Sequence, residues 1–179
     1  ASDLSAAERA EILRLSEIGS CLSEETLALL AEGSEAVDYR RRRFIYRTAD
    51  KADALYCIAR GRVKICLTDP ATAREAVIDI VGPGALFGES SLYSAGVREK
   101  CAIAYEQARL LKIPAGVYRE GMAASRELYD YTFRMVGQRL SRAERRVADF
   151  ALDAIPARLD KLLADLSERY GRPGADGVL

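Results

Sequence analysis

The chain has 179 residues, with 27 Lys and Arg against 27 Asp and Glu, four Cys, no His and no Trp. This length and a hydrophobic content of 49% are typical of a folded globular protein with one domain and an appended segment. A net charge of zero excludes a protein that coats nucleic acid through bulk positive charge. The absence of His excludes Ser-His-Asp and Cys-His catalysis and every His-ligated zinc, iron or haem centre within this chain. We therefore expect a protein that is not an enzyme.

The four cysteines, Cys21, Cys57, Cys66 and Cys101, form no C-x-x-C pair and lack the spacing of a metal site. We expect reduced thiols, buried as small hydrophobes in a cytoplasmic protein, and neither a metal nor an iron–sulfur cluster. A redox pair between Cys57 and Cys66 across a hairpin is the less favoured alternative. No apolar run approaches the roughly 20 residues that span a bilayer, and no signal-peptide pattern is visible, so we expect no membrane partner.

Residues 1–35 are predicted to form two short helices. An apolar stripe in the first helix is formed by Leu4, Ile12, Leu15 and Ile18. Ser23, followed by two glutamates, is typical of the residue that caps the start of the second helix. Gly19 and the serine after it predict a break between the two.

Residues 36 to about 114 alternate short β-prone runs with turn signals, a pattern typical of a sandwich or barrel. The Arg60–Gly61 step predicts a hairpin that places Ile58 opposite Val63. The Gly-Pro-Gly run at 82–84 must be a turn, since it cannot occupy a central strand. The predicted strands are 44–46, 54–59, 62–67, 76–81, 101–105 and 109–113.

Four consecutive arginines, Arg40 to Arg43, stand near the start of this β-rich segment, and Arg47 follows them. Acidic residues precede the run, and alternate side chains of a strand point outward. We interpret the run as a solvated strand edge that discourages pairing with another strand. A nucleic-acid patch is the alternative that we favour less.

The chain is predicted to be helical from about residue 115 almost to its end. Apolar residues recur there at spacings of three and four, close to a heptad pattern, with charged residues between them. One helix with a narrow apolar stripe favours a partner helix, and we expect a parallel two-fold homodimer. The alternative is that the stripe packs on the chain's own β-domain. The predicted dimer-interface residues are Tyr129, Thr132, Val136, Leu140, Ala143, Val147 and Phe150. A further helix is predicted at 158–170.

The glycine-rich stretch at 82–93, with Arg98 ten residues after Gly88, is the candidate site. A glycine-rich turn that feeds a short helix offers backbone N–H groups to an anion. An arginine that reaches back to the same place supplies a fork for phosphate, and Glu89 can accept hydrogen bonds from ribose-type hydroxyls. The alternative is an ordinary barrel loop with a surface arginine.

Five segments, in this order along the chain, resemble the cyclic-AMP receptor protein/fumarate–nitrate regulator (CRP/FNR) family of transcription regulators. The resemblance implies an α+β fold, in which a double-stranded β-helix (a cyclic-nucleotide-binding-like β-roll) follows N-terminal helices and precedes a long dimerisation helix and the first helix of a truncated winged helix-turn-helix. The implied parts are 1–35 for the N-terminal helices, 36–122 for the effector-binding β-roll, 123–153 for the dimerisation helix and 154–179 for the incomplete DNA-binding domain. The resembling segments are 54–63, 87–89 with Arg98, 110–114, 139–146 and 157–166.

In nucleotide-binding members of that family, the glycine and glutamate that match Gly88 and Glu89 hold the sugar, and the arginine that matches Arg98 holds the phosphate. Glu99 stands here where those members have a hydroxyl, and a carboxylate would repel a cyclic phosphate or neutralise Arg98. The long-helix positions that carry hydroxyls for the adenine ring in cyclic-AMP binders fall near Arg142 and Ala143. We therefore expect cyclic AMP and cyclic GMP to bind no tighter than about millimolar, with the effector unknown. The candidate effector-binding residues are Gly88, Glu89, Ser90, Arg98, Glu99, Lys100 and Arg142.

The resemblance implies the effector-sensing and dimerisation portion of a transcription regulator that controls DNA binding allosterically. DNA is then a partner of the full-length protein but not of this truncated chain, which we expect to stop before any recognition helix. The alternative is a stand-alone cyclic-nucleotide-binding module that regulates a protein partner. The predicted helix at 157–170 favours the transcription regulator.

Overall fold

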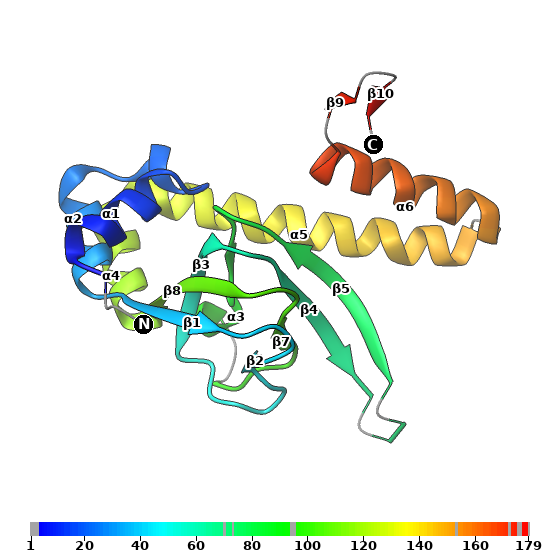
Figure 1. Cartoon of the computed structure of the whole chain (residues 1–179), viewed down its shortest axis with the longest axis horizontal. Helices are drawn as coiled ribbons and strands as arrows, with labels where there is room; N and C mark the ends of the chain where they lie inside the picture. The colour runs from blue at the N-terminus through cyan, green and yellow to red at the C-terminus, as the bar shows by residue number, and fades with distance from the viewer. Residues whose placement is uncertain are drawn as a thin grey trace. The chain divides into compact units, whose positions relative to one another are not determined.

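The computed structural model describes residues 4–69, 71–72, 74–93, 96–152, 154–171, 173–174 and 177–178 (Figure 1). The chain divides into two units, residues 1–133 and residues 134–179. The boundary falls inside a long helix, so each unit contains one part of that helix. No helix of the described ranges is both long and apolar enough to cross a membrane.

The first unit begins with two helices, α1 (Ala6–Arg14) and α2 (Glu24–Glu32), as predicted. Ser5 caps α1 through a capping box with Glu8, and Ser23 accepts a hydrogen bond from the Thr26 amide at the start of α2. The predicted break between them is the short 3-10 helix η1 (Gly19–Cys21). These caps satisfy backbone N–H groups that a helix start leaves without partners.

Two antiparallel four-stranded sheets form the β-roll of the first unit, so the predicted β-roll is confirmed (Figure 1). Their facing sides make the core, which includes Tyr56, Val63, Phe87, Ala102 and Leu110. All six predicted strands are present with small shifts at their ends, whereas β1 and β6 were not predicted. In order, the first sheet is β1 (Glu35–Tyr39), β8 (Ala108–Pro114), β3 (Ala54–Arg60) and β6 (Leu86–Phe87), and the second is β2 (Phe44–Tyr46), β7 (Cys101–Ala104), β4 (Val63–Thr68) and β5 (Glu75–Val81).

The predicted hairpin at Arg60–Gly61 is wrong. Strand β3 pairs with β8 and β6, whereas β4 pairs with β5 and β7 in the other sheet. Ile58 therefore lies opposite Leu110 and not opposite Val63. Gly61 turns the chain from one sheet to the other with a φ of +85°, and a Cβ there would collide with the carbonyl oxygen of a neighbouring turn. A turn signal between two β-prone runs does not by itself decide whether they pair.

The arginine run lies in the turn between β1 and β2, so the predicted strand edge is wrong for these residues. The side chains of Arg40 to Arg43 are exposed, as expected. Arg42 adopts a φ of +66°, which interrupts the extended backbone that a strand requires. The turn is held by hydrogen bonds between the backbones of Arg42 and Arg43 and that of Ala104 at the end of β7.

Two helices follow the β-roll, α4 (Ala115–Ala124) and α5 (Arg126–Leu152). Ser125 separates them with an extended backbone, and its hydroxyl oxygen accepts a hydrogen bond from the Leu128 amide at 3.1 Å. The predicted dimerisation helix therefore begins at Arg126 and not at residue 123. In the first unit, α4 packs against α2, and Leu128 at the start of α5 is fully buried.

The second unit contains the rest of α5, then α6 (Ile155–Tyr170) and the short antiparallel pair β9 (Pro173–Gly174) and β10 (Gly177–Val178). Asp149 on α5 pairs with Lys161 on α6 at 2.6 Å. The guanidinium of Arg158 lies 4.7 Å from the ring centre of Phe150. These two contacts join the end of α5 to α6.

Candidate effector-binding site

The candidate site lies where β6 leads into the short helix α3 (Ser90–Tyr93). Gly88 at this junction has a φ of +84°, a conformation that glycine adopts without strain. A Cβ at Gly88 would also lie only 3.2 Å from the carbonyl oxygen of Ala54, from a guanidinium nitrogen of Arg98 and from the ring of Tyr56. Glycine is thus required both for the turn and for the close approach of Arg98.

Arg98 is the largest fully buried side chain of the described residues, with 1% of its surface exposed. Its Nη1 donates to the carbonyl oxygen of Gly88 at 2.9 Å and to Oγ of Ser90 at 3.4 Å. Its Nη2 donates to the carbonyl oxygen of Ala54 at 2.5 Å. Arg98 thereby fastens the β6–α3 junction to the start of β3. Its Nε is buried and has no hydrogen-bond partner.

Two tyrosine rings lie near this guanidinium, and a phenylalanine packs against both tyrosines. The guanidinium carbon of Arg98 lies 4.2 Å from the ring centre of Tyr46 and 5.9 Å from that of Tyr56. Phe87 stacks on Tyr56 with their ring centres 5.2 Å apart. Burial raises the pKa of Tyr56, and the positive charge of Arg98 opposes that rise. The aromatic faces attract the cation, by about 2 kcal/mol when such a contact is desolvated.

The electrostatic balance around Arg98 is incomplete. Within the described residues, its hydrogen bonds go to two carbonyls and one hydroxyl, and to no carboxylate. A buried charge costs several kcal/mol unless a counter-charge and hydrogen bonds compensate it. The site therefore combines a buried positive charge with a free N–H donor, which are the two features that an anion would complete.

The structure brings together four of the predicted effector-binding residues: Gly88, Glu89, Ser90 and Arg98. Glu89 and Arg98 are both buried. Glu99 is exposed and Lys100 is half-buried, and neither forms a hydrogen bond with Arg98. The expected neutralisation of Arg98 by Glu99 is therefore wrong, because exposure alternates from Val97 to Glu99 and the two charged side chains face opposite ways.

Arg142 lies on the part of α5 that belongs to the second unit, where it is half-buried. Its membership of the effector site stays a prediction. Sequence reasoning also missed the inward-facing tyrosines, Tyr46 and Tyr56. Both are buried in the core of the β-roll. The signal that could have identified them is an aromatic residue on the inward face of a strand near the cassette arginine.

Sequence reasoning also did not predict how α4 connects the candidate site to the long helix α5. Arg119 on α4 donates through Nη2 to the carbonyl oxygen of Ser91 in α3 at 2.6 Å. The adjacent Tyr118 is fully buried, and its hydroxyl lies 2.9 Å from Oγ1 of Thr132 on α5. Burial raises the pKa of Tyr118 to about 12, which keeps its hydroxyl protonated. Helix α4 thus contacts both α3 and the start of α5.

Thr132 was predicted on the dimer interface, and the structure corrects this assignment. Its side chain is buried within its own chain, where Oγ1 donates to the carbonyl oxygen of Leu128 at 2.7 Å and contacts Tyr118. Phe133 is 73% exposed instead. With Phe133 in place of Thr132, the spacing alternates strictly between four and three residues. We call this set the α5 stripe: Tyr129, Phe133, Val136, Leu140, Ala143, Val147 and Phe150.

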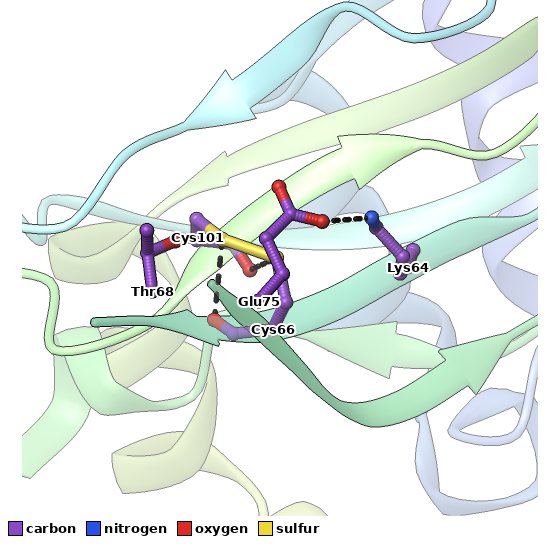
Figure 2. Close-up of polar contacts among 5 residues, drawn as sticks. All are labelled: Lys64, Cys66, Thr68, Glu75 and Cys101. Atoms are coloured by element: carbon purple, nitrogen blue, oxygen red, sulfur yellow. Dashed lines mark hydrogen bonds and ion pairs between the residues drawn. A yellow bond between two sulfur atoms is a disulfide. The ribbon is translucent and has the colours of Figure 1, made fainter. Parts of the chain in front are cut away.

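Two of the four cysteines form a disulfide, Cys66 with Cys101, which corrects the prediction of reduced thiols (Figure 2). Cys21 and Cys57 are free. The alternative pair of Cys57 and Cys66 is also wrong, because these residues lie in different sheets. Cys66 lies opposite Cys101 in the register of β4 and β7. The sequence analysis paired β4 with β3 in a hairpin, and it therefore did not place Cys66 opposite Cys101. No cluster of three or more His, Cys, Asp or Glu side chains in the described ranges is placed to hold a metal ion.

Residues 36–125 match the family described as cyclic nucleotide-binding domain. The CRP-like cAMP-activated global transcriptional regulator of Mycobacterium tuberculosis is 29% identical over 161 residues, which cover 90% of this chain and 71% of that protein. The N-terminal domain of a transcriptional regulator from Streptomyces coelicolor A3(2) is 29% identical, with a TM-score of 0.56 over 74% of this chain and 94% of that one. The catabolite activator protein of Thermus thermophilus is 26% identical, with a TM-score of 0.64 over 73% and 61%. The chain belongs to the cyclic nucleotide-binding domain family, within the CRP/FNR transcription regulators.

Proposed function

We propose that this chain is the effector-sensing and dimerisation portion of a CRP/FNR-type regulator, and that its effector is a small molecule with an anionic group that binds Arg98. One observation carries the proposal: Arg98 is buried without a carboxylate partner, and its Nε has no hydrogen-bond acceptor. An acidic group at Nε would supply both the counter-charge and the missing acceptor. A cyclic nucleotide is the first class to test, because the M. tuberculosis relative is described as cAMP-activated.

The expectation of very weak cyclic-nucleotide binding depended on Glu99 beside Arg98 and on the lack of hydroxyls near Arg142 and Ala143 on the long helix. Since Glu99 is exposed while Arg98 is buried, the carboxylate does not occupy the place of the anion. Solvent screens an exposed charge far more than a buried one, so its repulsion of a bound phosphate is small. We therefore propose that a cyclic nucleotide binds tighter than about 1 mM, with Arg98 as the residue that meets its phosphate.

The proposed route from the effector to α5 runs through α4. An anion at the free Nε of Arg98 would draw the guanidinium toward itself, weaken its hydrogen bond to the Gly88 carbonyl and so displace the β6–α3 junction. Ser91 in α3 is held by Arg119, and Tyr118 beside it is bonded to Thr132 on α5. A shift of α3 is thereby passed to the start of the long helix. This contiguous set of contacts is a physical basis for allosteric control, and its coupling is measurable by mutation.

We propose that the α5 stripe is covered by the same stripe of a second copy of this chain. Its alternating spacing of four and three residues is the seam of a two-stranded coiled coil. Leu140, Val147 and Phe150 are 60%, 69% and 72% exposed in the single chain. Arginines and acidic residues flank the stripe, as in the solvated positions of a dimeric helix pair. Two identical stripes related by a two-fold axis bury each other's apolar surface, and such a dimer is closed because no further copy can add to the interface.

DNA is the proposed target of the whole regulator, with α6 as the first helix of its DNA-binding domain. The described residues after α6 form the short β9–β10 pair. We expect the 179-residue chain itself to bind duplex DNA weakly, without sequence preference and with a steep loss on adding salt. A tight, sequence-selective complex of this chain with DNA would contradict that part of the proposal.

Titration calorimetry with cyclic AMP and cyclic GMP tests the effector site. We expect saturable binding to the wild type and at least a tenfold loss of affinity, about 1.4 kcal/mol, in Arg98→Ala. Arg98→Lys keeps the charge but lacks Nε and the planar fork, so it should also bind more weakly. Glu99→Ser is the matched control and should change affinity less than twofold. Unaltered binding in Arg98→Ala, with a native circular dichroism spectrum, would contradict the proposed site.

A further inference from the structure

The disulfide joins the two central strands of the second sheet. Cys66 and Cys101 are the last register pair of the β4–β7 ladder, with their Cα atoms 5.3 Å apart and a sequence separation of 35. Figure 2 shows it beside Thr68 and the ion pair of Lys64 with Glu75. The crosslink therefore closes the end of the ladder at which β7 begins.

This disulfide lies on the outer face of its sheet, away from the core of the β-roll. Ala102 belongs to the main core, whereas Cys101 and Ile103, on alternate positions of β7, form a separate cluster with Cys66 and the half-buried Phe44. The two sulfur-bearing residues are 0% and 2% exposed, and side chains cover them. One neighbour is the exposed Thr68, whose Oγ1 lies 3.6 Å from Sγ of Cys101. Because this cluster is separate from the main core, local opening of the strand end would uncover the sulfurs without disrupting that core.

The position of the crosslink connects it to the effector site. Cys101 is the first residue of β7 and lies three residues after Arg98. Its neighbour Ala102 pairs with Tyr46 on β2, and the Tyr46 ring lies against the Arg98 guanidinium at 4.2 Å. The start of β7 thus holds both Arg98, through the chain, and Tyr46, through the sheet. A crosslink that fixes this strand end restricts the movement of both.

We propose that Cys66 and Cys101 form a reversible dithiol–disulfide site that sets the affinity of the Arg98 site, an inference whose binding readout rests on the proposed function. In reduction, a thiolate of a dithiol reductant attacks one sulfur and forms a mixed disulfide, and the second thiol of the reductant releases it. The reductant loses two electrons and two protons and becomes a disulfide. Both cysteines become thiols. A small-molecule disulfide of the glutathione type reverses the exchange.

The other two cysteines do not enter this exchange. Cys57 is fully buried in the first sheet, and burial raises its pKa to about 12, so it stays an unreactive thiol. Cys21 lies in η1 among the N-terminal helices, in a different part of the first unit. The pair on β4 and β7 is therefore the redox couple that the described residues provide.

Thiol trapping measures the chemistry without any effector. The chain is purified without reductant, denatured in iodoacetamide and weighed by mass spectrometry. We expect two alkylated cysteines, Cys21 and Cys57, four after treatment with dithiothreitol, and a return to two in oxidised glutathione. Cys21→Ser, as the control, should lose one alkylation in every state and keep the exchange. Four alkylations in the untreated protein, or a crosslink that dithiothreitol does not open in the native protein, would overturn the proposal.

Two native-state measurements test the coupling to Arg98. We expect reduced wild type to bind cyclic AMP at least fivefold more weakly than oxidised wild type, and Cys66→Ala/Cys101→Ala to match the reduced protein in both buffers. Hydrogen exchange at residues 46 and 98 gives a readout that needs no effector, and reduction should accelerate it. If no nucleotide binds but exchange accelerates, the proposed effector fails and the redox coupling stands. Unchanged exchange on reduction would overturn the coupling.

Discussion

Residues 4–135 and residues 136–171 contain similar apolar side chains but bury them very differently. Leu110, Leu111 and Ile113 in the β-roll are fully buried, whereas Leu140 and Val147 on α5 are 60% and 69% exposed. After Met135, no residue whose side chain the structure describes is buried. The first region satisfies its apolar surface within one chain. The second has a regular apolar stripe of a kind that soluble proteins keep for contact with another surface.

The charged groups show the opposite contrast. In the second region, the ion pair of Lys161 with Asp149 is partly solvated. In the first, the buried Arg98 has no anionic partner among the described residues, and its Nε has no hydrogen-bond acceptor. Each region is therefore incomplete in one respect, a counter-charge in the β-roll and an apolar cover on α5. This contrast is the basis of our proposals that a small anion binds the first region and that a second chain covers the stripe of the second.

The largest effect is expected from charges placed in the α5 stripe. Val136→Glu with Leu140→Glu would place two carboxylates per helix in an apolar seam, where an unpaired charge is strongly unfavourable. Sedimentation should show a monomer. Gln138→Glu with Arg145→Glu, on exposed positions away from the stripe, should remain dimeric. A dimer that survives the first substitution would show that α5 is not the interface.

Reduction of the disulfide should destabilise the β-roll and leave the second region unchanged. A crosslink that closes a loop of 35 residues contributes about 4 kcal/mol through the entropy of the unfolded chain. Urea unfolding with and without dithiothreitol measures the difference in the free energy of unfolding. Cys66→Ala/Cys101→Ala should lose its dependence on dithiothreitol. A stability of the wild type that does not respond to reductant would contradict the role assigned to the crosslink.

Gly88→Ala should lower the free energy of unfolding by about 1–3 kcal/mol, because it forces a left-handed backbone on a residue with a Cβ. The added methyl would also meet Arg98 and Tyr56 at 3.2 Å. Gly96→Ala is the matched control, since Gly96 has a φ of +95° but no atom within 4 Å of an added Cβ. Thermal unfolding should rank Gly88→Ala as the less stable variant. Equal losses would mean that crowding at Arg98 contributes nothing.

The smallest effect is expected from Tyr118→Phe, which removes one buried hydrogen bond with Thr132. The loss should be about 1 kcal/mol, since Thr132 keeps its bond to the carbonyl of Leu128. Denaturant titration measures it, and Tyr105→Phe, on an exposed tyrosine, is the control. In the same variant, binding of nucleotide should alter hydrogen exchange in α5 less than in the wild type. An undiminished response would exclude Tyr118 from the route to α5.

The sequence was sufficient to place six of the eight strands of the β-roll and the Gly88–Arg98 spacing, because period-two patterns and glycine turns are local signals. The pairing of strands was not accessible in this way. A turn at Gly61 is compatible with a hairpin and with a change of sheet, and this ambiguity also hid the opposition of Cys66 and Cys101. The prediction that Thr132 lies on the dimer interface was wrong for a related reason. Spacings of three and four both fit a helix, and only the contact with Tyr118 shows that Thr132 faces its own chain.

In the regulator that we propose, a small anion completes the β-roll and a second chain covers the α5 stripe. A native mass spectrum of the purified wild-type chain, with Arg98→Ala and Val136→Glu/Leu140→Glu for comparison, tests both parts together. We predict a complex of twice the 19.6 kDa chain mass that carries a small acidic ligand. Arg98→Ala should lose the ligand, and the stripe variant should lose the dimer. A wild-type spectrum with only bare monomer, unchanged when cyclic AMP is added, would contradict the claim.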